Sequence, residues 1–541
     1  MSEYLKPPVD PLDGPTFALG GRVVTMNDHA EVIDEGVVYV GKGSVVAVQE
    51  RVAPPPFGLE DLKVLETRGT IYPGLIDLHD HLSYNALQLW DVPKRYTNRD
   101  QWAQGDTYRK LVTGPMKVLA HTKEYVPAIV RYVECKCLVG GTTTSQGIAL
   151  SSYAGIQRFY KGIVRNVEQT DEPDLPEAGT HIADVEATDR GKFLERLASL
   201  DCLLLHLSEG TDDKAREHFL ALEGPSGKWA VTSSLAGIHC VALKRKDFDV
   251  LGKAGAAMVW SPLSNLLLYG ETADVSAARA EGVLVALGPD WSPSGSKNLL
   301  GELKIARLVS ELGGDGLSDF ELLSLATRSA AKVLKWDTQL GQVEEGMRAD
   351  LLVVSGVDGD GHAHLFTRNE HDIELVVVNG VPRYGASRVM RRLQGEAAAG
   401  EAGSVGGRAR LFDLAQPTSD PAVGELTLAE ATELLADGLK RLPELAKDLV
   451  ARPEVSPDEE FLVLDHDDLG GFDVRPHLPI RDGTLTATMA ADGAGSTPLP
   501  DLLEPLTLDP LTVVDDHRFV DVLAKEGNLP KEVAAHVPEL F

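Results

Sequence analysis

The chain has 541 residues, of which 43% are hydrophobic and 25% are charged, and this suits a globular protein with more than one domain. No apolar run is long enough to cross a bilayer, and the formal net charge of −30 disfavours binding to phosphate backbones. We therefore expect no membrane and no nucleic acid among its partners.

The N-terminal residues and the cysteine content both predict a cytoplasmic protein. The first residues lack the basic start and apolar middle of a signal peptide. Four cysteines are too few for a disulfide framework, so we expect reduced and buried thiols. Cys135 and Cys137 form a C-x-C pair, but they lie in a segment typical of a helix running into a turn, and we assign no metal to them.

Short β-branched segments separated by glycines begin the chain and predict strands. Similar segments return after the expected helix of residues 319–336. The pattern predicts a small β-sandwich in two pieces, with residues 1–73 as its N-terminal half and residues 336–388 as its C-terminal half.

Between these pieces, in residues 74–335, short apolar strands alternate with helical stretches. Eight such alternations predict an α/β fold, namely a closed (β/α)8 TIM-like barrel. The expected strands are residues 75–79, 142–146, 162–168, 181–186, 202–207, 236–241, 257–261 and 283–288.

The remainder of the chain has a different composition. Residues 389–410 are rich in glycine and alanine and are typical of a linker. Residues 411–541 contain an amphipathic helix pattern and acidic, proline-rich stretches. We expect a C-terminal α/β appendage whose role the sequence does not state.

The stretch "GLIDLHDHLSYN" places two histidines, His79 and His81, at the end of the first barrel strand. Because side chains alternate along a strand, both imidazoles point to the same side and can bind one ion. Three later strands end in similar polar side chains, which are His206 and Glu209 in "LLLHLSEG", His239 in "AGIHCVAL" and Asp290 in "LGPD".

Active sites of barrel enzymes lie at the carboxyl ends of the strands, so these residues converge in the expected fold. Imidazoles and a carboxylate bind zinc or ferrous iron, and a bound metal lowers the pKa of water from ~15.7 to about 7. A buried carboxylic acid can then move the proton.

Each residue alone also has an ordinary interpretation. The two histidines of the first strand can be structural, His239 can be a hydrogen-bonded core residue, Glu209 a charge at a helix N-terminus and Asp290 a turn residue. Their occurrence in order at the same ends of separate strands favours the metal site.

Five motifs carry a resemblance to a known family: "YPGLIDLHDH", "LLLHLSEG", "GIHCVAL", "LGPD" and "TRSAAKVLKWDTQLGQVEEGMRADLLVV". Over about residues 16–385 the chain resembles the amidohydrolase superfamily, in the mononuclear branch of guanine deaminase, adenosylhomocysteine-type deaminases and triazine hydrolases. The resemblance implies one divalent metal, Zn²⁺ or alternatively Fe²⁺, and four ligands: His79, His81, His206 and Asp290.

The same resemblance implies roles in the reaction. Glu209 would move protons between water and the leaving group, and His239 would hydrogen-bond the water or polarise the substrate. Asp290 would also accept a proton from the nucleophilic water. Relatives of this kind are often oligomers, which suggests a homodimer.

Two positions depart from the deaminase pattern. In "WSPLSN" Trp260 replaces the usual histidine, and Trp291 follows the final aspartate where many relatives have glycine. Together with Trp90 in the long first loop, they suggest a flat or bulky apolar substrate, although core packing explains any one of them equally well.

Four polar residues near these positions are left outside the expected site. Ser264 and Asn265 are interpreted as holding a strand-end turn, and Lys297 and Asn298 as capping the helix after the eighth strand.

The leading hypothesis is a metal-dependent aminohydrolase that uses metal-activated hydroxide on a C–N bond of a cyclic or heteroaromatic small molecule. The same site could instead displace a halide or open a cyclic amide. A catalytically silent scaffold is the alternative from another class, but such a protein should have lost ligands, and all of them are present here.

Overall fold

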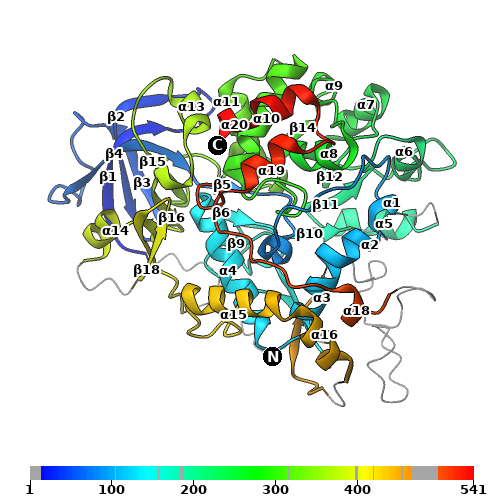
Figure 1. Cartoon of the computed structure of the whole chain (residues 1–541). Coiled ribbons are helices and arrows are strands. Elements are labelled where there is room, and N and C mark those ends of the chain that lie inside the picture. Colours follow the sequence, from blue (N-terminus) through cyan, green and yellow to red (C-terminus); the bar gives the residue numbers. More distant parts are fainter. Residues whose placement is uncertain are drawn as a thin grey trace, which may run out of the picture.

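The computed structural model describes residues 14–103, 105–155, 157–182, 184–185, 188–314, 316–395, 400–417, 419–451, 455–464 and 497–541. Figure 1 shows a β-rich region, formed by both early and late parts of the chain, beside a larger α/β region. The fourth barrel strand, expected at residues 181–186, lies partly outside the described residues.

The β-rich region is one mixed sheet of nine strands in the order β18-β19-β17-β16-β15-β4-β1-β2-β3. β15 pairs antiparallel with both β4 and β16, which joins the two pieces expected from the sequence. The strands are β1 (Phe17–Val24), β2 (Val32–Gly41), β3 (Ser44–Glu50), β4 (Val64–Pro73), β15 (Leu351–Ser355), β16 (Ile373–Val378), β17 (Val381–Ala386), β18 (Glu401–Val405) and β19 (Arg408–Phe412). Because β4 and β15 are hydrogen-bonded neighbours, strands of both pieces belong to one sheet. This sheet bends back on itself, since Ala349 donates to Gly43 O (2.9 Å) in the β2–β3 turn and accepts from Gly380 N (2.9 Å) in the β16–β17 turn. The β-sandwich stays a prediction.

The expected linker at residues 389–410 is wrong. This part of the chain contains most of helix α14 (Ser387–Gln394), strand β18 and the start of β19. Gly406 and Gly407 have φ angles of 54° and 71° and form the turn between the two strands. Glycine-rich composition indicated a flexible segment, but backbone pairing with β17 makes it part of the sheet.

The α/β region contains two sheets with only parallel pairing. One has β5 (Leu75–Ile76), β6 (Thr142–Ser145) and β9 (Arg165–Asn166), and the other has β10 (Ala178–His181), β11 (Cys202–Leu207), β12 (Leu235–His239), β13 (Ala257–Trp260) and β14 (Leu284–Leu287). Hydrogen bonds from Leu78 N to Leu287 O (3.4 Å) and from Ala178 N to Val167 O (2.8 Å) connect the two sheets at both edges. The eight strands therefore neighbour one another in chain order.

The fourth of these strands lies earlier than expected. β10 ends at His181, where the strand at residues 181–186 was expected to begin. The segment "AGTH" has few β-branched residues and gives little strand signal, but its backbone pairs with β11 from Ala178 to His181.

Helices alternate with the later strands and cover them. They are α4 (Tyr125–Val139), α5 (Arg190–Ser199), α6 (Asp213–Leu220), α7 (Arg245–Ala254), α8 (Pro262–Tyr269), α9 (Val275–Ala280), α10 (Leu299–Gly313), α11 (Asp319–Leu325) and α12 (Arg328–Leu334). In α7 the residues Phe248 and Leu251, three apart, are fully buried, and Gly255 ends the helix with a φ of 70°.

The long loop after β5 contains only short helical turns. They are η1 (Leu82–Ala86), α1 (Asp100–Ala103), α2 (Asp106–Tyr108), η2 (Arg109–Thr113) and α3 (Gly114–Ala120). Shorter elements elsewhere are β7 (Ala149–Ser152), β8 (Gln157–Phe159), α13 (Gly361–His364), η3 (Leu365–Thr367) and η4 (Glu370–Asp372).

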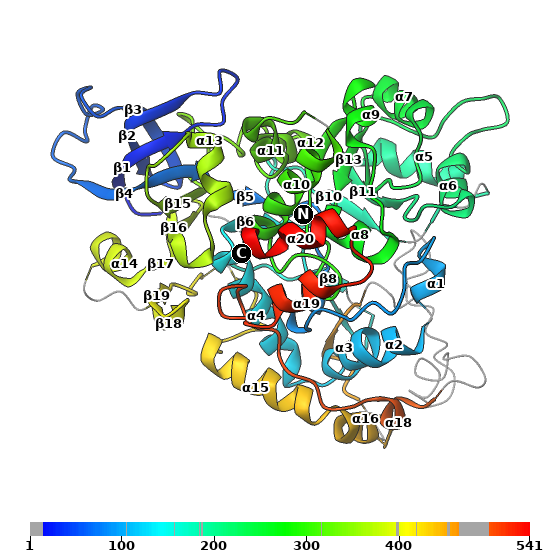
Figure 2. The same cartoon turned by 45° about the horizontal axis from the view of Figure 1, so that its top comes forward.

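The C-terminal segment packs into the rest of the molecule and is no separate appendage. Its described elements are α15 (Leu428–Lys440), α16 (Leu442–Ala451), β20 (Glu460–Leu462), α18 (Leu499–Leu502), α19 (Phe519–Lys525) and α20 (Lys531–Leu540). β20 pairs with β7, and Leu435, Phe519 and Val537 are buried in the main core. In Figures 1 and 2, α20 lies against α10, α19 packs on α20, and α15 runs beside α4.

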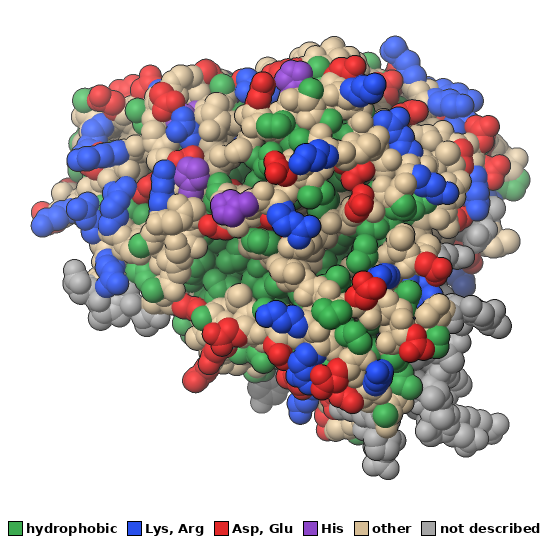
Figure 3. Space-filling view, in the orientation of Figure 1, with side chains coloured by type: hydrophobic (Ala, Val, Ile, Leu, Met, Phe, Trp, Pro, Cys, Tyr) green, Lys and Arg blue, Asp and Glu red, His purple; other side chains and the backbone are tan. Residues whose placement is uncertain are grey.

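Charged side chains of both signs are interspersed over the face of the molecule shown in Figure 3. Among the described helices, none combines the length and the apolar character that a membrane span requires.

Candidate metal centre

The residues expected at the site lie at the carboxyl ends of the parallel strands. His206 belongs to β11, and His239 is the last residue of β12. The first and last strand ends are tied together, because His81 N donates to Asp290 O (2.6 Å) and Asp290 N donates to His79 O (2.9 Å). His239 and Asp290 have φ angles of 66° and 72°, a conformation that costs energy outside glycine and concentrates at functional sites.

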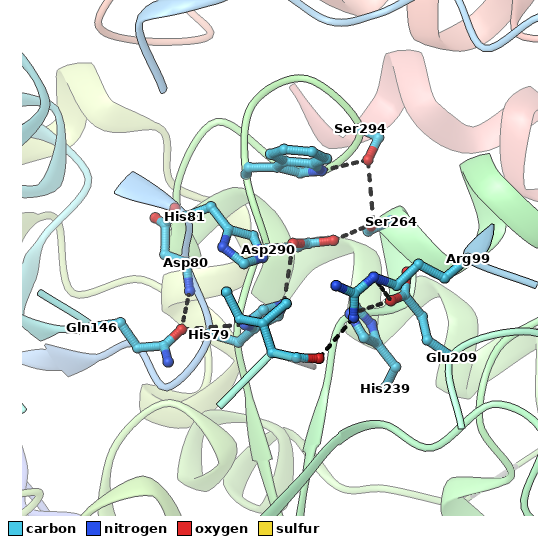
Figure 4. A network of polar contacts seen from close by, with 12 residues as sticks. His79, Asp80, His81, Arg99, Gln146, Glu209, His239, Ser264, Asp290 and Ser294 are labelled. Atoms are coloured by element: carbon cyan, nitrogen blue, oxygen red, sulfur yellow. Dashed lines mark hydrogen bonds and ion pairs between the residues drawn. The ribbon is translucent and has the colours of Figure 1, made fainter. Parts of the chain in front are cut away.

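The four histidines form one compact, buried cluster. The ring of His79 lies 4.9 Å from that of His81, 4.7 Å from that of His206 and 5.0 Å from that of His239. Asp290 Oδ1 lies 3.1 Å from His79 Nε2 and 3.4 Å from His81 Nε2. Figure 4 shows the imidazoles of His79 and His81 turned toward the Asp290 carboxylate.

These side chains fit a bound cation. Among the described residues, the buried atoms His79 Nε2 and His206 Nδ1 have no hydrogen-bond partner. Asp290 lies close to His79 Nε2 but does not bond to it in hydrogen-bond geometry. Zinc bonds to nitrogen and oxygen are about 2.0–2.2 Å long, so two ligands of one ion lie roughly 2.8–3.6 Å apart for bond angles between about 90° and 110°. His79 Nε2 and Asp290 Oδ1 lie 3.1 Å apart and do not form a hydrogen bond. This separation is the one expected for two ligands of the same ion.

The protonation states also suit metal binding. Burial lowers the pKa of His79 and lowers those of His206 and His239 well below the usual range, which keeps these imidazoles neutral. Burial opposes ionisation of Asp290, but the neighbouring imidazoles outweigh it and lower its pKa. The centre thus combines neutral nitrogen donors with a carboxylate.

Neighbouring side chains hold His79 in one orientation. Gln146 Oε1 lies 3.2 Å from His79 Nδ1 and also accepts a hydrogen bond from Asp80 N (2.9 Å). Because an amide oxygen only accepts, Nδ1 carries the proton and Nε2 is left as the donor atom for a metal. Asp77 Oδ1 accepts from the backbone N–H of His79 (3.0 Å).

Glu209 lies at the edge of the cluster in a buried position. Tyr269 OH donates to its Oε1 (2.7 Å), and Trp102 Nε1 donates in turn to Tyr269 OH (2.9 Å). Arg99 Nε and His239 Nε2 each lie 3.9 Å from its Oε2. Burial raises the pKa of Glu209 to about 7 against the opposing charge of Arg99, so both protonation states are accessible near neutral pH.

Ser264 and Asn265 belong to the site, contrary to the expectation that they only hold a turn. Ser264 Oγ donates to Asp290 Oδ2 (2.5 Å), and Asn265 Nδ2 lies 2.9 Å from His239 Nδ1. They occupy the first turn of α8, directly after β13, and that position at the carboxyl end of a strand was the signal available in the sequence.

A chain of hydrogen bonds behind His239 fixes its tautomer. Trp260 Nε1 donates to Thr272 Oγ1 (2.7 Å), which donates to Asn265 Oδ1 (3.2 Å). The Asn265 amide group therefore points toward His239 Nδ1, which accepts, and the proton lies on Nε2, on the side of Glu209. Trp260 is thus connected to His239 through three hydrogen bonds and lies on the side of His239 that carries Nδ1.

The two other tryptophans that were expected near the substrate lie at different distances from the histidine cluster. Trp291 lies beside the cluster, and Trp90 lies further out. The Trp291 ring is 5.4 Å from that of His81, and its Nε1 donates to Ser294 Oγ (2.5 Å). Trp90 packs on Tyr108, whose ring is 6.0 Å from that of Trp291. Trp102, which lies 6.3 Å from Trp291, and Tyr108 come from the loop after β5, and they went unnoticed because that loop has no periodic pattern.

Of the two residues expected to cap the helix after the eighth strand, one does and one does not. Asn298 caps α10 as expected, since its side chain accepts from Gly301 N (2.9 Å). Lys297 is no cap and forms ion pairs with Asp509 and Asp516 of the C-terminal segment. All four cysteines are buried and free, and none belongs to the groups able to hold a metal in the described part of the chain.

Comparison with known proteins identifies similar sequences and a similar fold. Residues 205–383 match the model of the amidohydrolase family. The 5-methylthioadenosine/S-adenosylhomocysteine deaminase of Symbiobacterium thermophilum is 24% identical over 413 residues, which cover 67% of this chain and 89% of that protein. Its namesake from Caldanaerobacter subterraneus subsp. tengcongensis is 32% identical over 157 residues, covering 26% of this chain and 35% of the relative.

Among solved structures, an adenosine deaminase from Xanthomonas campestris with bound zinc has a TM-score of 0.57 at 17% identity. The match covers 80% of this chain and 99% of that one. At this identity the likeness establishes a common fold.

Proposed function

We propose that this chain, whose residues 205–383 match the amidohydrolase family, is a metal-dependent aminohydrolase of a cyclic or heteroaromatic small molecule. The family matches confirm the resemblance that the sequence motifs indicated. The observation that carries the proposal is the convergence of buried neutral imidazoles, an ionised Asp290 and a carboxyl group with a pKa near 7 at the ends of separate strands.

We propose that residues 74–335 form a closed (β/α)8 barrel with the site at its carboxyl-terminal mouth. The chain-order pairing of the parallel strands supports this, as do the hydrogen bonds between Leu78 and Leu287 and between Val167 and Ala178. The nine-stranded sheet would be the second domain, formed from both sides of the barrel in the sequence.

We propose four ligands of one divalent ion, Zn²⁺ before Fe²⁺: His79, His81, His206 and Asp290. When bound, such an ion lowers the pKa of water and polarises the carbon–nitrogen system of the substrate. The proposal rests on the donor set, on the unpartnered nitrogens of His79 and His206 in the described structure, and on the distances around Asp290 Oδ1.

The protein side chains would manage the protons. Asp290, held through Oδ2 by Ser264, would accept a proton from the attacking water, and His239 would donate a hydrogen bond from Nε2 to the attacking oxygen. Protonated Glu209 would deliver its proton to the departing nitrogen as the C–N bond breaks, which releases ammonia. Trp291 and the neighbouring aromatic rings would exclude water and stack on a flat ring.

The decisive experiment is ammonia release by the purified, zinc-loaded full chain from a panel of amino-substituted heterocycles. Adenine nucleosides, including 5-methylthioadenosine and S-adenosylhomocysteine, come first because of the named relatives. We expect ammonia in equal amount to the hydroxylated product. Chloride release from a chlorotriazine, or ring opening of a cyclic amide without ammonia, would establish an alternative reaction. A chain that binds no metal and turns over nothing would indicate the silent scaffold.

Replacing Glu209 with glutamine tests its assignment as the proton donor. Glu209→Gln keeps the shape and the contact with Tyr269 but cannot transfer a proton, so kcat should fall at least about 100-fold. Metal analysis should find the wild-type zinc content. Normal turnover in this variant would contradict the role of Glu209.

A cytoplasmic location and a homodimer stay predictions. Size-exclusion chromatography with light scattering tests the homodimer.

A further inference from the structure

A second buried cluster of charges lies next to the candidate metal centre and includes residues from the C-terminal segment. Lys136 Nζ lies 2.5 Å from Asp509 Oδ2, while Lys297 pairs with Asp509 Oδ1 and, at 2.8 Å, with Asp516 Oδ2. The side chains of Lys136, Lys297 and Asp509 are at most 2% exposed. Burying such charges costs several kcal/mol per ion, so stability alone is a weak explanation for the cluster.

Lys136 connects this charge cluster with the loop after His81 and with the loop after Asp290. Besides Asp509, its ammonium group donates to Asn85 O (2.8 Å) and to Ser292 Oγ (2.7 Å). These three contacts use all three N–H groups of the lysine. Asn85 precedes the bulk of the first loop, and Ser292 lies two residues after Asp290.

Asn85 binds Asp80, the residue between His79 and His81 in the chain. Its Nδ2 donates to both carboxylate oxygens of Asp80 (2.8 and 3.1 Å), and its Oδ1 accepts from Ser292 N (2.7 Å). Asn85 and Lys136 therefore hold the histidine pair and the loop after Asp290 in one fixed relation.

A small polar cavity separates two acidic groups from the two lysines. It is just large enough for one water molecule, and its lining includes Asp77, Asp80, Lys136 and Lys297. Without Asp509, Lys136 would lose its ion-pair partner from the C-terminal segment and would repel Lys297 nearby. Its ammonium group would then be expected to move toward Asp77 and Asp80 and away from Ser292.

The C-terminal segment is held firmly at this point. Asp509 N donates to Ala86 O (3.0 Å), and Tyr132 OH donates to Asp509 O. Further along, Asn528 Nδ2 donates to Val92 O (3.0 Å), and Arg95 Nε donates to Asn528 O (2.7 Å). The segment thus braces the same loop that follows the histidine pair.

We propose that Asp509 is a positioning residue of the metal centre, which it orders through Lys136, Asn85 and Asp80. The C-terminal segment would then complete the active site of the barrel from outside it. This inference rests on the proposed function, because it requires that the histidine cluster bind a metal.

Cobalt binding to the full chain tests the inference without any substrate. Co²⁺ in a site of nitrogen and oxygen ligands absorbs visible light, and its affinity is measured by competition with a chelator. In Asp509→Asn we expect about ten-fold weaker cobalt binding, at the lower end of what loss of an outer-shell partner costs, and a changed visible spectrum. Asp509→Glu, which restores the charge, should recover affinity and spectrum at least in part.

Asp515→Asn is the matched control. Asp515 lies in the same segment, but its carboxylate contacts Thr512 Oγ1 (2.7 Å) and Gly406 N (3.0 Å) and not the lysines. This variant should keep the wild-type affinity and spectrum. A folded Asp509→Asn protein with wild-type affinity and spectrum would overturn the positioning role.

If Asp509→Asn does not fold, the paired variant Lys136→Met/Asp509→Leu replaces both charged side chains by apolar ones and leaves Lys297 with Asp516. It should fold, bind cobalt more weakly and show the changed spectrum; unchanged binding would overturn the inference. A wild-type chain that binds no cobalt would instead contradict the metal centre itself, and the inference with it.

Discussion

At the scale of single residues, the site depends on the hydrogen bonds that orient each imidazole. Gln146 fixes His79, and the chain from Trp260 through Thr272 and Asn265 fixes His239. The tryptophan that replaces the expected histidine in "WSPLSN" thus acts at a distance of three hydrogen bonds. The sequence marked Trp260 as unusual and left a substrate contact and core packing equally open, since spacing along the chain does not reveal the direction of a side chain.

Asn265→Leu tests this orientation. Leucine is branched at the same carbon as asparagine but cannot donate to His239 Nδ1, so the imidazole loses its fixed tautomer. We expect kcat to fall about ten-fold or more, with the zinc content unchanged. Trp260→Phe, which removes only the far end of the chain, should have a smaller effect, and full activity in Asn265→Leu would contradict the role assigned to this bond.

At the scale of elements, the strand ends and the first turns of the following helices build the site. The sequence predicted β11, β12, β13 and β14 within two residues at each end, because these strands are short apolar runs bounded by polar residues. It misplaced β10, because "AGTH" has few β-branched residues, and it missed the hairpin β18–β19, because glycine-rich composition indicated a flexible segment. The clustering of the candidate ligand residues could be predicted because they lie at or near the carboxyl ends of parallel strands.

Helix α10 carries a buried acid that should make stability depend on pH. Glu302 accepts hydrogen bonds from Leu263 N (3.0 Å) and Ser296 Oγ, and burial raises its pKa to about 8. Below about pH 4.5 the group is protonated in both the folded and unfolded chain. Between that pH and about 8 only the unfolded chain ionises, so the free energy of unfolding falls as pH rises through this window.

Urea denaturation at pH 5 and pH 8 measures this effect. Glu302→Gln removes the titrating group while an amide can still accept from Leu263 N, so the variant should lose less stability between the two pH values than the wild type. Equal losses in both proteins would show that Glu302 is ionised in the folded state.

At the scale of the whole molecule, the described part of the C-terminal segment is integral to the fold. Its apolar residues Phe519, Leu523 and Val537 are buried in the core that also contains residues of the parallel strands, and Asp509 neutralises two buried lysines. The sequence did not predict this docking, because the contacts join residues hundreds of positions apart and the composition of the segment resembles that of an independent appendage.

A chain that ends at residue 496 tests whether folding depends on the C-terminal segment. Truncation would expose the apolar surface that faces these residues and leave Lys136 and Lys297 buried without Asp509, and breaking a buried pair typically costs about 3–5 kcal/mol. We expect the truncated chain to yield no cooperative thermal transition by circular dichroism. A stable truncated chain with the wild-type midpoint would show that the segment is dispensable for folding.

The central claim is that side chains from separate strand ends bind one catalytic ion. Crystals grown with zinc and measured at the zinc absorption edge test it most directly. The account predicts one anomalous peak about 2.0–2.2 Å from donor atoms of His79, His81, His206 and Asp290. A map without a peak at these residues, with their imidazoles turned toward other partners, would contradict it.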